Sequence, residues 1–143
     1  MGGENMNKRK QILIIDGQGG KIGSGLIEAL REYRASAEII AIGTNSIATA
    51  NMLRSSPDAA ATGKNPVLVN CRDADVIVGP VGIVIADSLY GEVTPAMASA
   101  VGQSRAERVL IPVNKCSSVV VGVDDLPLSA LIQAAVRHIA ELL

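Results

Sequence analysis

The stretch Gln11-Ile-Leu-Ile-Ile-Asp16-Gly17-Gln18-Gly19-Gly20-Lys21-Ile22-Gly23 decides the fold of this chain. Its four consecutive apolar residues, 12–15, are typical of a short buried strand, and the four glycines that follow within seven residues end that strand. An amphipathic helix is predicted to begin at once. The expected apolar face of this helix consists of Ile22, Leu26, Ala29, Leu30 and Tyr33. A strand, a glycine turn and a helix form the front half of a βαβ unit, whose helix N-terminus offers N–H groups to a phosphate.

The length and composition indicate one α/β domain. The chain has 143 residues, of which 11–143 are expected to form a single domain and 1–10 a flexible tail. Aliphatic residues supply almost the whole core, because Phe and Trp are absent and only two Tyr are present. Such small, branched side chains suit a mostly parallel sheet that is covered by helices on both faces.

The charge balance argues against several kinds of partner. With 13 basic and 14 acidic residues the chain has no electrostatic footprint for nucleic acid, and its few aromatic residues leave little to stack on bases. The longest apolar run, 76–86, is too short to span a bilayer and is broken by Gly79, Pro80 and Gly82. We therefore expect a cytoplasmic protein with no nucleic-acid and no membrane partner.

Strand and helix patterns alternate along the rest of the chain. Further strands are predicted at 38–42, 67–69, 75–78, 108–113 and 119–123, with a loop at 58–65 and either a strand or a crossover at 83–93. A short helix capped by Thr44 or Ser46 is expected to run to Arg54, and a second helix from Thr94-Pro95 to Ser104. The last helix is expected to be capped by Asp124 or Asp125, with Pro127 in its first turn. Its apolar stripe is Leu128, Leu131, Ile132, Ala135, Val136, Ile139 and Leu142. This alternation predicts a Rossmann-like, doubly wound sheet.

Polar and glycine-rich residues follow the predicted strands, where ligands bind in open α/β sheets. The candidate ligand-binding residues are Asp16, Gly17, Gln18, Gly19, Gly20, Lys21, Ile22, Gly43, Thr44, Asn45, Gly79, Pro80 and Asn114. Asn, Thr and Lys side chains are suitable donors for phosphate and ribose oxygens. The alternative is that the glycines only form a tight turn.

The glycine turn departs from known phosphate-binding fingerprints. Its spacing is G-x-G-x-x-x-G, because Ile22 stands where the third glycine of the dinucleotide motif would fall. It is no Walker A loop either, since Lys21 is followed by Ile22 and not by Ser or Thr. No acidic residue ends the strand 38–42, which slightly favours NADP over NAD, although no arginine lies beside Thr44 and Asn45 to confirm NADP. NADP or another phosphorylated nucleotide is the expected ligand.

Two further groups are weaker candidates for chemistry. Asp87, Tyr90 and Glu92 could supply a general acid/base pair, although solvated carboxylates on a loop are the favoured interpretation. Cys71 and Cys116 could meet as nucleophile or metal ligands. Since no His converges on them, we expect reduced thiols and no metal site.

Several segments carry a resemblance to a known family. They are Ile15-Asp16-Gly17-Gln18-Gly19-Gly20, Ile42-Gly43-Thr44-Asn45-Ser46-Ile47-Ala48-Thr49, Ala61-Thr62-Gly63, Val78-Gly79-Pro80-Val81-Gly82-Ile83, Ala86-Asp87-Ser88, Gly91-Glu92-Val93-Thr94-Pro95 and Ile111-Pro112-Val113-Asn114-Lys115-Cys116. These segments resemble an uncharacterised bacterial family, domain of unknown function 3842. The similarity runs from about residue 11 to 123. It implies a Rossmann-like single domain and assigns no catalytic residue.

Three classes of function remain open from the sequence. The first is a nucleotide-binding module, a sensor or regulatory subunit. The second is a small NADP-dependent oxidoreductase whose substrate site is completed by 86–92 or by a second subunit. The third is a structural or interaction protein that kept the fold without the ligand. A homodimer is expected, because Ile83, Val84, Ile85 and Leu89 offer more apolar surface than one sheet easily covers.

Overall fold

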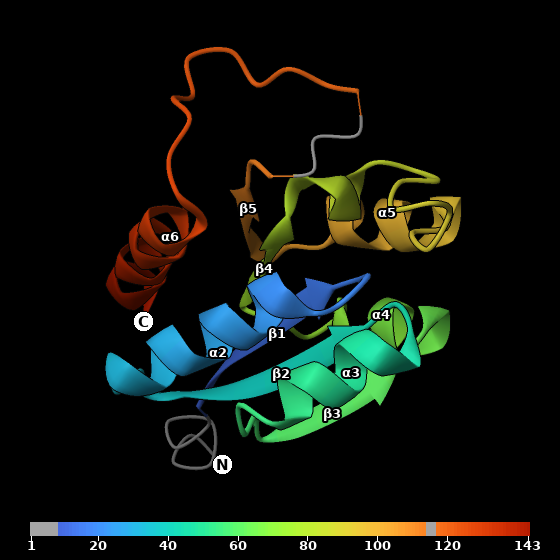
Figure 1. The fold of residues 1–143 in the computed structure, drawn as a ribbon. Helices are drawn as coiled ribbons and strands as arrows, with labels where there is room; N and C mark the ends of the chain where they lie inside the picture. The colour runs from blue at the N-terminus through green and yellow to red at the C-terminus, as the bar shows by residue number, and fades with distance from the viewer. Residues whose placement is uncertain (1–8, 114–116) are drawn as a thin grey trace.

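A parallel β-sheet with strand order β3-β2-β1-β4-β5 forms the centre of the molecule (Figure 1). The computed structural model describes residues 9–113 and 117–143. The strands are β1 (Lys10–Asp16), β2 (Ala37–Gly43), β3 (Ala59–Thr62), β4 (Val76–Pro80) and β5 (Glu107–Ile111). Every pairing between neighbours is parallel, so all five strands end at the same edge of the sheet.

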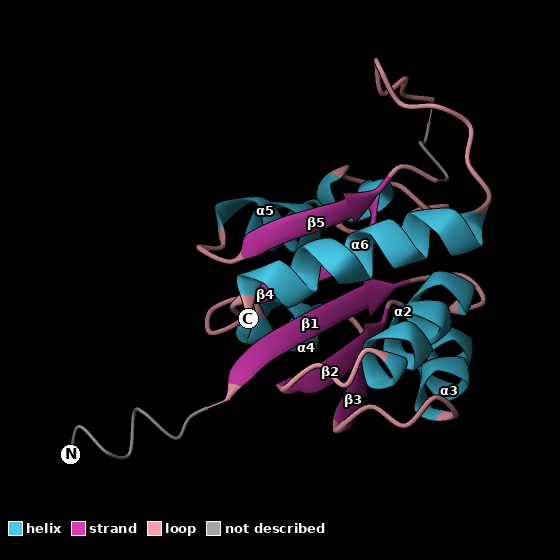
Figure 2. Cartoon of the chain, turned by 90° about the vertical axis from the view of Figure 1, so that its left-hand side faces the viewer, coloured by secondary structure: helices cyan, strands magenta, loops and turns pink. Residues whose placement is uncertain are grey.

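Helices cover both faces of this sheet, which confirms the doubly wound α/β prediction. One face packs against α2 (Lys21–Glu32), α3 (Ser46–Leu53) and α6 (Leu128–Leu142), and the other against α4 (Lys64–Asn70), the 3₁₀ turn η1 (Val81–Val84) and α5 (Pro95–Gln103). Figure 2 shows α6 crossing in front of the sheet. Successive side chains of β1 point to opposite faces of the sheet. Ile12 and Ile14 pack towards α2 and α6, and Leu13 and Ile15 pack towards α4 and α5.

The predictions for helices α5 and α6 are confirmed. Thr94 caps α5, since its hydroxyl accepts a hydrogen bond from the N–H of Met97 at 3.1 Å, and Pro95 is the first helical residue. The stripe predicted for α6 is also observed. Its buried members are Ile132, Ala135, Val136 and Ile139. Tyr33 was misplaced on the apolar face of α2, because it ends that helix and is 49% exposed.

The predictions for 58–65 and 67–69 were wrong. The expected loop contains the edge strand β3, whose alanines have low strand propensity, and the expected strand is helix α4. In a strand Val67 and Val69 would share one face, whereas here Val67 is fully buried and Val69 is 41% exposed. Pro66 fits the first turn of α4, where its missing N–H has no intrahelical partner to lose.

Other sequence predictions also need correction. Residues 119–123 form no strand in the described chain, although their β-branched side chains suit one. Asn45, and not Thr44 or Ser46, caps α3, because its side chain accepts from the N–H of Ala48. Pro127, and not Asp124 or Asp125, is the N-cap of α6, which has no side-chain cap; the Pro127 carbonyl accepts from the N–H groups of Ala130 and Leu131. The open question at 83–93 resolves as η1 followed by turns.

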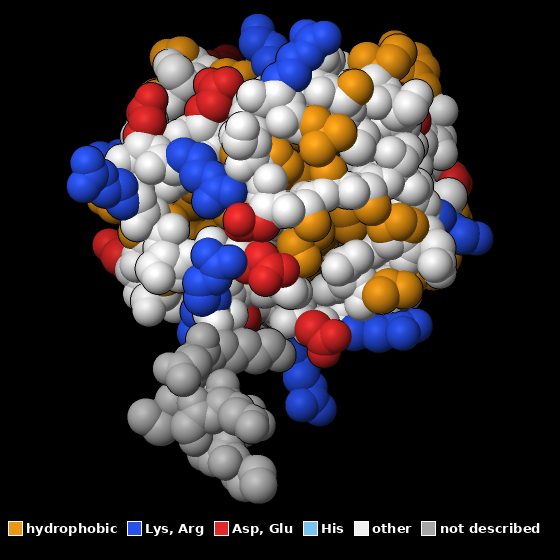
Figure 3. All heavy atoms as spheres, turned by 90° about the horizontal axis from the view of Figure 1, so that it is seen from below, with side chains coloured by type: hydrophobic (Ala, Val, Ile, Leu, Met, Phe, Trp, Pro, Cys, Tyr) orange, Lys and Arg blue, Asp and Glu red, His pale blue; other side chains and the backbone are white. Residues whose placement is uncertain are grey.

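The N-terminal boundary and the surface complete the fold. Lys10 already belongs to β1, so the predicted tail is too long by that residue, and residues 1–8 lie outside the described chain. On the face drawn in Figure 3, basic and acidic side chains lie interspersed with hydrophobic ones. Over the residues that the structure describes, no helix combines the length and apolarity needed to cross a membrane.

Candidate functional site

The glycine turn lies where the strand order reverses. β1 pairs with β2 on one side and with β4 on the other, so the connections from these strands diverge around the carboxyl end of β1. Open α/β sheets bind ligands at such switch points. The turn 17–20 and the start of α2 occupy this position.

Asp16 fixes the shape of the turn. It is only 4% exposed, and its Oδ1 accepts from the N–H of Gly17 at 2.8 Å while its Oδ2 accepts from the N–H of Gly23 at 2.7 Å. Burial raises the pKa of Asp16 above its usual value, against the opposing effect of these backbone hydrogen bonds. The structure therefore supports a role for Asp16 in anchoring the turn by backbone hydrogen bonds.

Helix α3 holds the turn from the other side. The amide groups of Asn45 and Asn51 donate to the carbonyl groups of Gln18 at 2.9 Å and of Gly19 at 2.7 Å. Because a trans peptide points its N–H opposite to its carbonyl, the N–H of Gly19 faces away from Asn45. In the same way the N–H of Lys21 points out of the first helical turn, since the Gly20 carbonyl accepts from Ser24 inside it. Among residues 9–113 and 117–143, neither of these two N–H groups has an acceptor.

Three of the four glycines between residues 17 and 23 have a structural explanation. A Cβ at Gly17 would lie 2.6 Å from the Thr44 hydroxyl, and a Cβ at Gly23 would strike the Met52 sulfur. Gly20 has a φ of +70°, and a Cβ there would lie 2.6 Å from a backbone oxygen of α3. Gly19 differs from them: it does not adopt a left-handed conformation, and a Cβ would meet nothing within 4 Å. No packing contact in the described structure therefore requires glycine at position 19.

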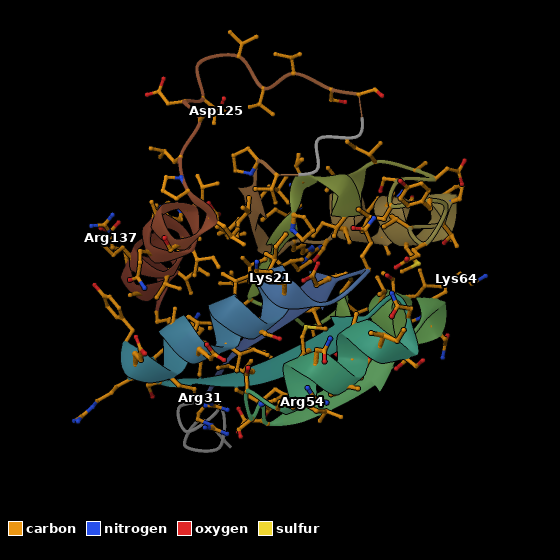
Figure 4. All side chains as sticks on the ribbon, viewed as in Figure 1. Lys21, Arg31, Arg54, Lys64, Asp125 and Arg137 are labelled. Carbon is orange, nitrogen blue, oxygen red and sulfur yellow. The ribbon has the colours of Figure 1, made fainter. Side chains whose placement is uncertain are left out.

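Three cavities meet at Gly19. One, of about 300 Å³, lies above the turn, and two more, each of about 680 Å³, extend along α2 and α3 and towards Tyr90. The first is lined by Asp16, Gly17, Gln18, Gly19, Gly20, Lys21, Ile22, Leu89, Val113 and Leu128. In Figure 4 Lys21 lies near the centre of the view at the start of α2, whereas Lys64 and Arg137 lie at the periphery. The cavity thus combines an apolar wall with a cation and the positive end of a helix dipole.

Glu92 clamps the loop after β4 onto the turn. Its Oε1 accepts from the Thr44 hydroxyl at 2.6 Å, from the Asn45 amide at 2.8 Å and from the Gln18 N–H at 2.9 Å. Burial alone would raise the pKa of Glu92, but these three hydrogen bonds together lower it below its usual value. The interpretation of Glu92 as a solvated loop carboxylate was therefore wrong, because it links the ends of β1 and β2.

The loop that carries Glu92 is conformationally strained. Asp87, Leu89 and Tyr90 have positive φ angles of 64°, 54° and 56°, each costing about 1 kcal/mol relative to the right-handed region. Buried Leu89 and the anchored Glu92 offset this cost. Asp87 is exposed and lines none of the cavities at Gly19, while Tyr90 is 96% exposed. Tyr90 and Glu92 thus line one cavity without Asp87, so the three suggested acid/base residues do not all converge on one point.

The other predicted ligand residues divide into three groups. Thr44 and Asn45 lie at the site, but their side chains are engaged by Glu92, Gln18 and α3. Gly43, Gly79 and Pro80 are buried at the ends of β2 and β4, and a Cβ at Gly79 would strike the Ile15 carbonyl. Asn114 lies outside the described residues, as does Cys116.

Sequence reasoning missed four residues of the site. Leu89, Val113 and Leu128 supply apolar lining, and Asn51 positions Gly19. Val113 directly precedes the predicted strand-end residue Asn114, so its sequence position was a usable signal. No local pattern singles out the other three, because only tertiary packing brings them to the turn.

Cys71 is expected to react slowly with thiol reagents at neutral pH. Burial raises the pKa of this free thiol to about 11, so roughly 10⁻⁴ of it is thiolate at pH 7, against a few per cent for an ordinary cysteine. Alkylation of a Cys116→Ser variant, followed by mass spectrometry, isolates Cys71. The rate should rise with pH up to about 11 and should be at least about a hundredfold below that of a denatured control at pH 7. Equal rates in the native and denatured protein would contradict this.

Comparison with known proteins gives a family but no activity. Residues 11–143 match the family model described as Domain of unknown function (DUF3842), which confirms the resemblance. No match emerges from the comparison with curated proteins. Among solved structures, AibC has a TM-score of 0.50 at 18% identity, over 97% of this chain and 41% of AibC. A dodecameric FMN-dependent UbiX-like decarboxylase from Escherichia coli O157:H7 has a TM-score of 0.45 at 20% identity, over 93% of this chain and 75% of that one. The chain thus spans about two fifths of the length of AibC, and the likeness shows the α/β fold alone.

Proposed function

The chain belongs to the family of the domain of unknown function DUF3842, and we propose that it is a nucleotide-binding module, a sensor or regulatory subunit, that holds a phosphate at Gly19. The observation that carries this proposal is the environment of Gly19. It is the one glycine of the turn with open space around its Cα and no left-handed φ, and three cavities meet there. A small residue at that point suits the close approach of a ligand to the backbone.

The Lys21 side chain and the N–H groups beside Gly19 favour an anion at the start of α2. Lys21 and the outward N–H groups of residues 19 and 21 lie at the positive end of α2. The carboxylates of Asp16 and Glu92 are already held by N–H groups of residues 17, 18 and 23. A phosphate is thus expected at Gly19 and Lys21, with the Asp16 carboxylate, which lines the same cavity, flanking it.

The position of Glu92 bears on the choice between NADP and NAD as the ligand. The sequence places no acidic residue at the end of β2, but the loop after β4 brings the Glu92 carboxylate to Thr44 and Asn45 there. The reason for favouring NADP over NAD therefore no longer holds. The ligand class under this proposal is a phosphorylated nucleotide.

A thermal-shift scan with NADP, NAD, ATP, AMP and FMN tests the proposal. A ligand at about a hundred times its dissociation constant should stabilise the native state by roughly 2.7 kcal/mol, which raises the melting temperature by about 10 °C for a domain of this size. Mass spectrometry of the denatured protein should also detect a copurified nucleotide. If a stripped, folded sample shows no shift with any of the five compounds, the proposal fails.

We also propose a homodimer, on a different surface from the one expected. Ile83 and Leu89 are 1% and 6% exposed, so they belong to the core of this chain and not to a free face. The segment 117–127 instead exposes Val119 by 85% and Val121 by 92%, and β5 ends the sheet among the described strands. Such exposed apolar residues suit pairing with a second copy.

Light scattering at micromolar concentration should give about twice the 14.8 kDa of one chain. The double variant Val119→Ser/Val121→Ser should be monomeric, whereas Val69→Ser, a change at an exposed valine of α4, should leave the dimer intact. A wild-type mass equal to one chain would refute the dimer.

A further inference from the structure

The cavity between Ile47 and Tyr90 exposes apolar side chains beside the glycine turn. It is shallow and widely open to solvent, with a volume of about 680 Å³. Its lining is Gln18, Gly19, Asn45, Ser46, Ile47, Tyr90 and Glu92. Ile47 is 67% exposed and Tyr90 is 96% exposed. Removing apolar surface from water is favourable, so a flat ligand that covers these two side chains would gain binding free energy.

Glu92 gives the same cavity one free acceptor. Its Oε1 is bound by three donors, from residues 18, 44 and 45, which fix the side chain in place. Within the two described ranges of the chain, 9–113 and 117–143, its Oε2 has no hydrogen-bond partner. A carboxylate oxygen held in this way can accept from a pair of ligand hydroxyls without further ordering.

Gly19 joins this cavity to the one above the turn. Residues 18 and 19 line both, so a ligand with a phosphate at Gly19 can extend directly towards Tyr90. The strained loop conformation at Leu89 and Tyr90, held by buried Leu89 and by Glu92, fixes the backbone that carries the exposed Tyr90 side chain beside this cavity.

We propose that the cavity between Ile47 and Tyr90 holds the base and ribose of a nucleotide, with the base against Tyr90 and the ribose hydroxyls donating to Glu92 Oε2. This rests on the proposed function, because it assumes a phosphate at Gly19. It adds a selectivity that Glu92 determines: the site takes nucleotides with free ribose hydroxyls and rejects those with a 2′-phosphate, since two anions would then meet.

Three adenosine compounds test the role of Glu92. Calorimetry should show that the wild type binds 5′-AMP at least about tenfold more tightly than adenosine 2′,5′-bisphosphate or 2′-deoxy-5′-AMP. Glu92→Gln keeps the acceptor that holds the loop but removes the charge, so it should bind the bisphosphate within about threefold of 5′-AMP. Melting curves check that the variant is folded. If the wild type binds the bisphosphate as tightly as 5′-AMP, or if Glu92→Gln keeps the full preference, the proposal is overturned.

The two tyrosines of the chain provide a matched test of the base site. Tyr90→Ala should weaken 5′-AMP binding roughly tenfold while leaving the binding of ribose 5-phosphate, which has no base, unchanged. Tyr33→Ala, at the far end of α2, should change neither. Equal 5′-AMP affinities in Tyr90→Ala and the wild type would overturn the base site. If the wild type binds ribose 5-phosphate as tightly as 5′-AMP, only this inference fails. If it binds neither compound, the proposed function fails as well.

Discussion

Replacing Gly19 by Val is expected to abolish nucleotide binding and to leave the fold intact. The new side chain would occupy the point where the three cavities meet, in front of the N–H groups that are proposed to hold the phosphate. Because a Cβ at this position meets nothing within 4 Å and the backbone is not left-handed, the melting temperature of the free protein should stay within about 2 °C of the wild type. The thermal shift of about 10 °C that a bound nucleotide gives the wild type should be lost.

Gly20→Val is the control for this experiment. It changes the neighbouring glycine, but its φ of +70° and the oxygen of Ala48 at 2.6 Å from the new Cβ make the change disruptive to the fold. Gly20→Val should therefore melt well below the wild type without ligand. An equal ligand-induced shift in Gly19→Val and the wild type would show that the ligand binds elsewhere.

Asp16→Ala is expected to lower the free energy of unfolding by about 3 kcal/mol. The change leaves the N–H groups of Gly17 and Gly23 without their acceptor in a buried position, and each unsatisfied group costs roughly 1–3 kcal/mol. For a domain of this size the loss corresponds to a melting temperature about 10 °C lower. Urea unfolding and calorimetry of the two proteins measure the difference.

The opposite end of β1 supplies the matched control. The Asp75 carboxylate accepts from the N–H of Gln11 at 2.8 Å, the same kind of bond as at Asp16 but exposed to water. Asp75→Ala should therefore cost less than about 1 kcal/mol, because water replaces the lost acceptor. Equal losses in the two variants would contradict a specific anchoring role for Asp16.

Helices and strands could be predicted where neighbouring residues in the sequence determine them, and could not where tertiary packing does. The run before Asp16 is continuously apolar and the stripe of α6 is strongly periodic, so both elements could be predicted from the sequence. Strand β3 could not, because three alanines pair with β2 at a half-exposed edge and show no apolar pattern. Residues 67–69 and 119–123 have strand-forming side chains, yet one segment is helical and the other is unpaired in the described chain. Strand propensity expresses packing against neighbours, which the sequence does not place.

The same distinction applies to the site. The glycine turn was found because its residues are contiguous, and its position beside the reversal of strand order followed from the fold class. Glu92 was noticed as a carboxylate but assigned no contact, since its three donors lie 47 to 74 residues away along the chain. For the same reason no local pattern indicates that the Thr44 and Asn45 side chains are hydrogen-bonded within the protein.

The most direct test of the central claim is a titration of ¹⁵N-labelled protein with 5′-AMP, followed by NMR at the amides of Gly19 and Lys21. The proposed phosphate position predicts that these two N–H signals shift most, because they would gain a charged acceptor, while the N–H signals of Gly17 and Gly23, already bound to Asp16, change little. Saturating shifts confined to other parts of the chain, or no shift at millimolar 5′-AMP, would contradict a phosphate site at Gly19.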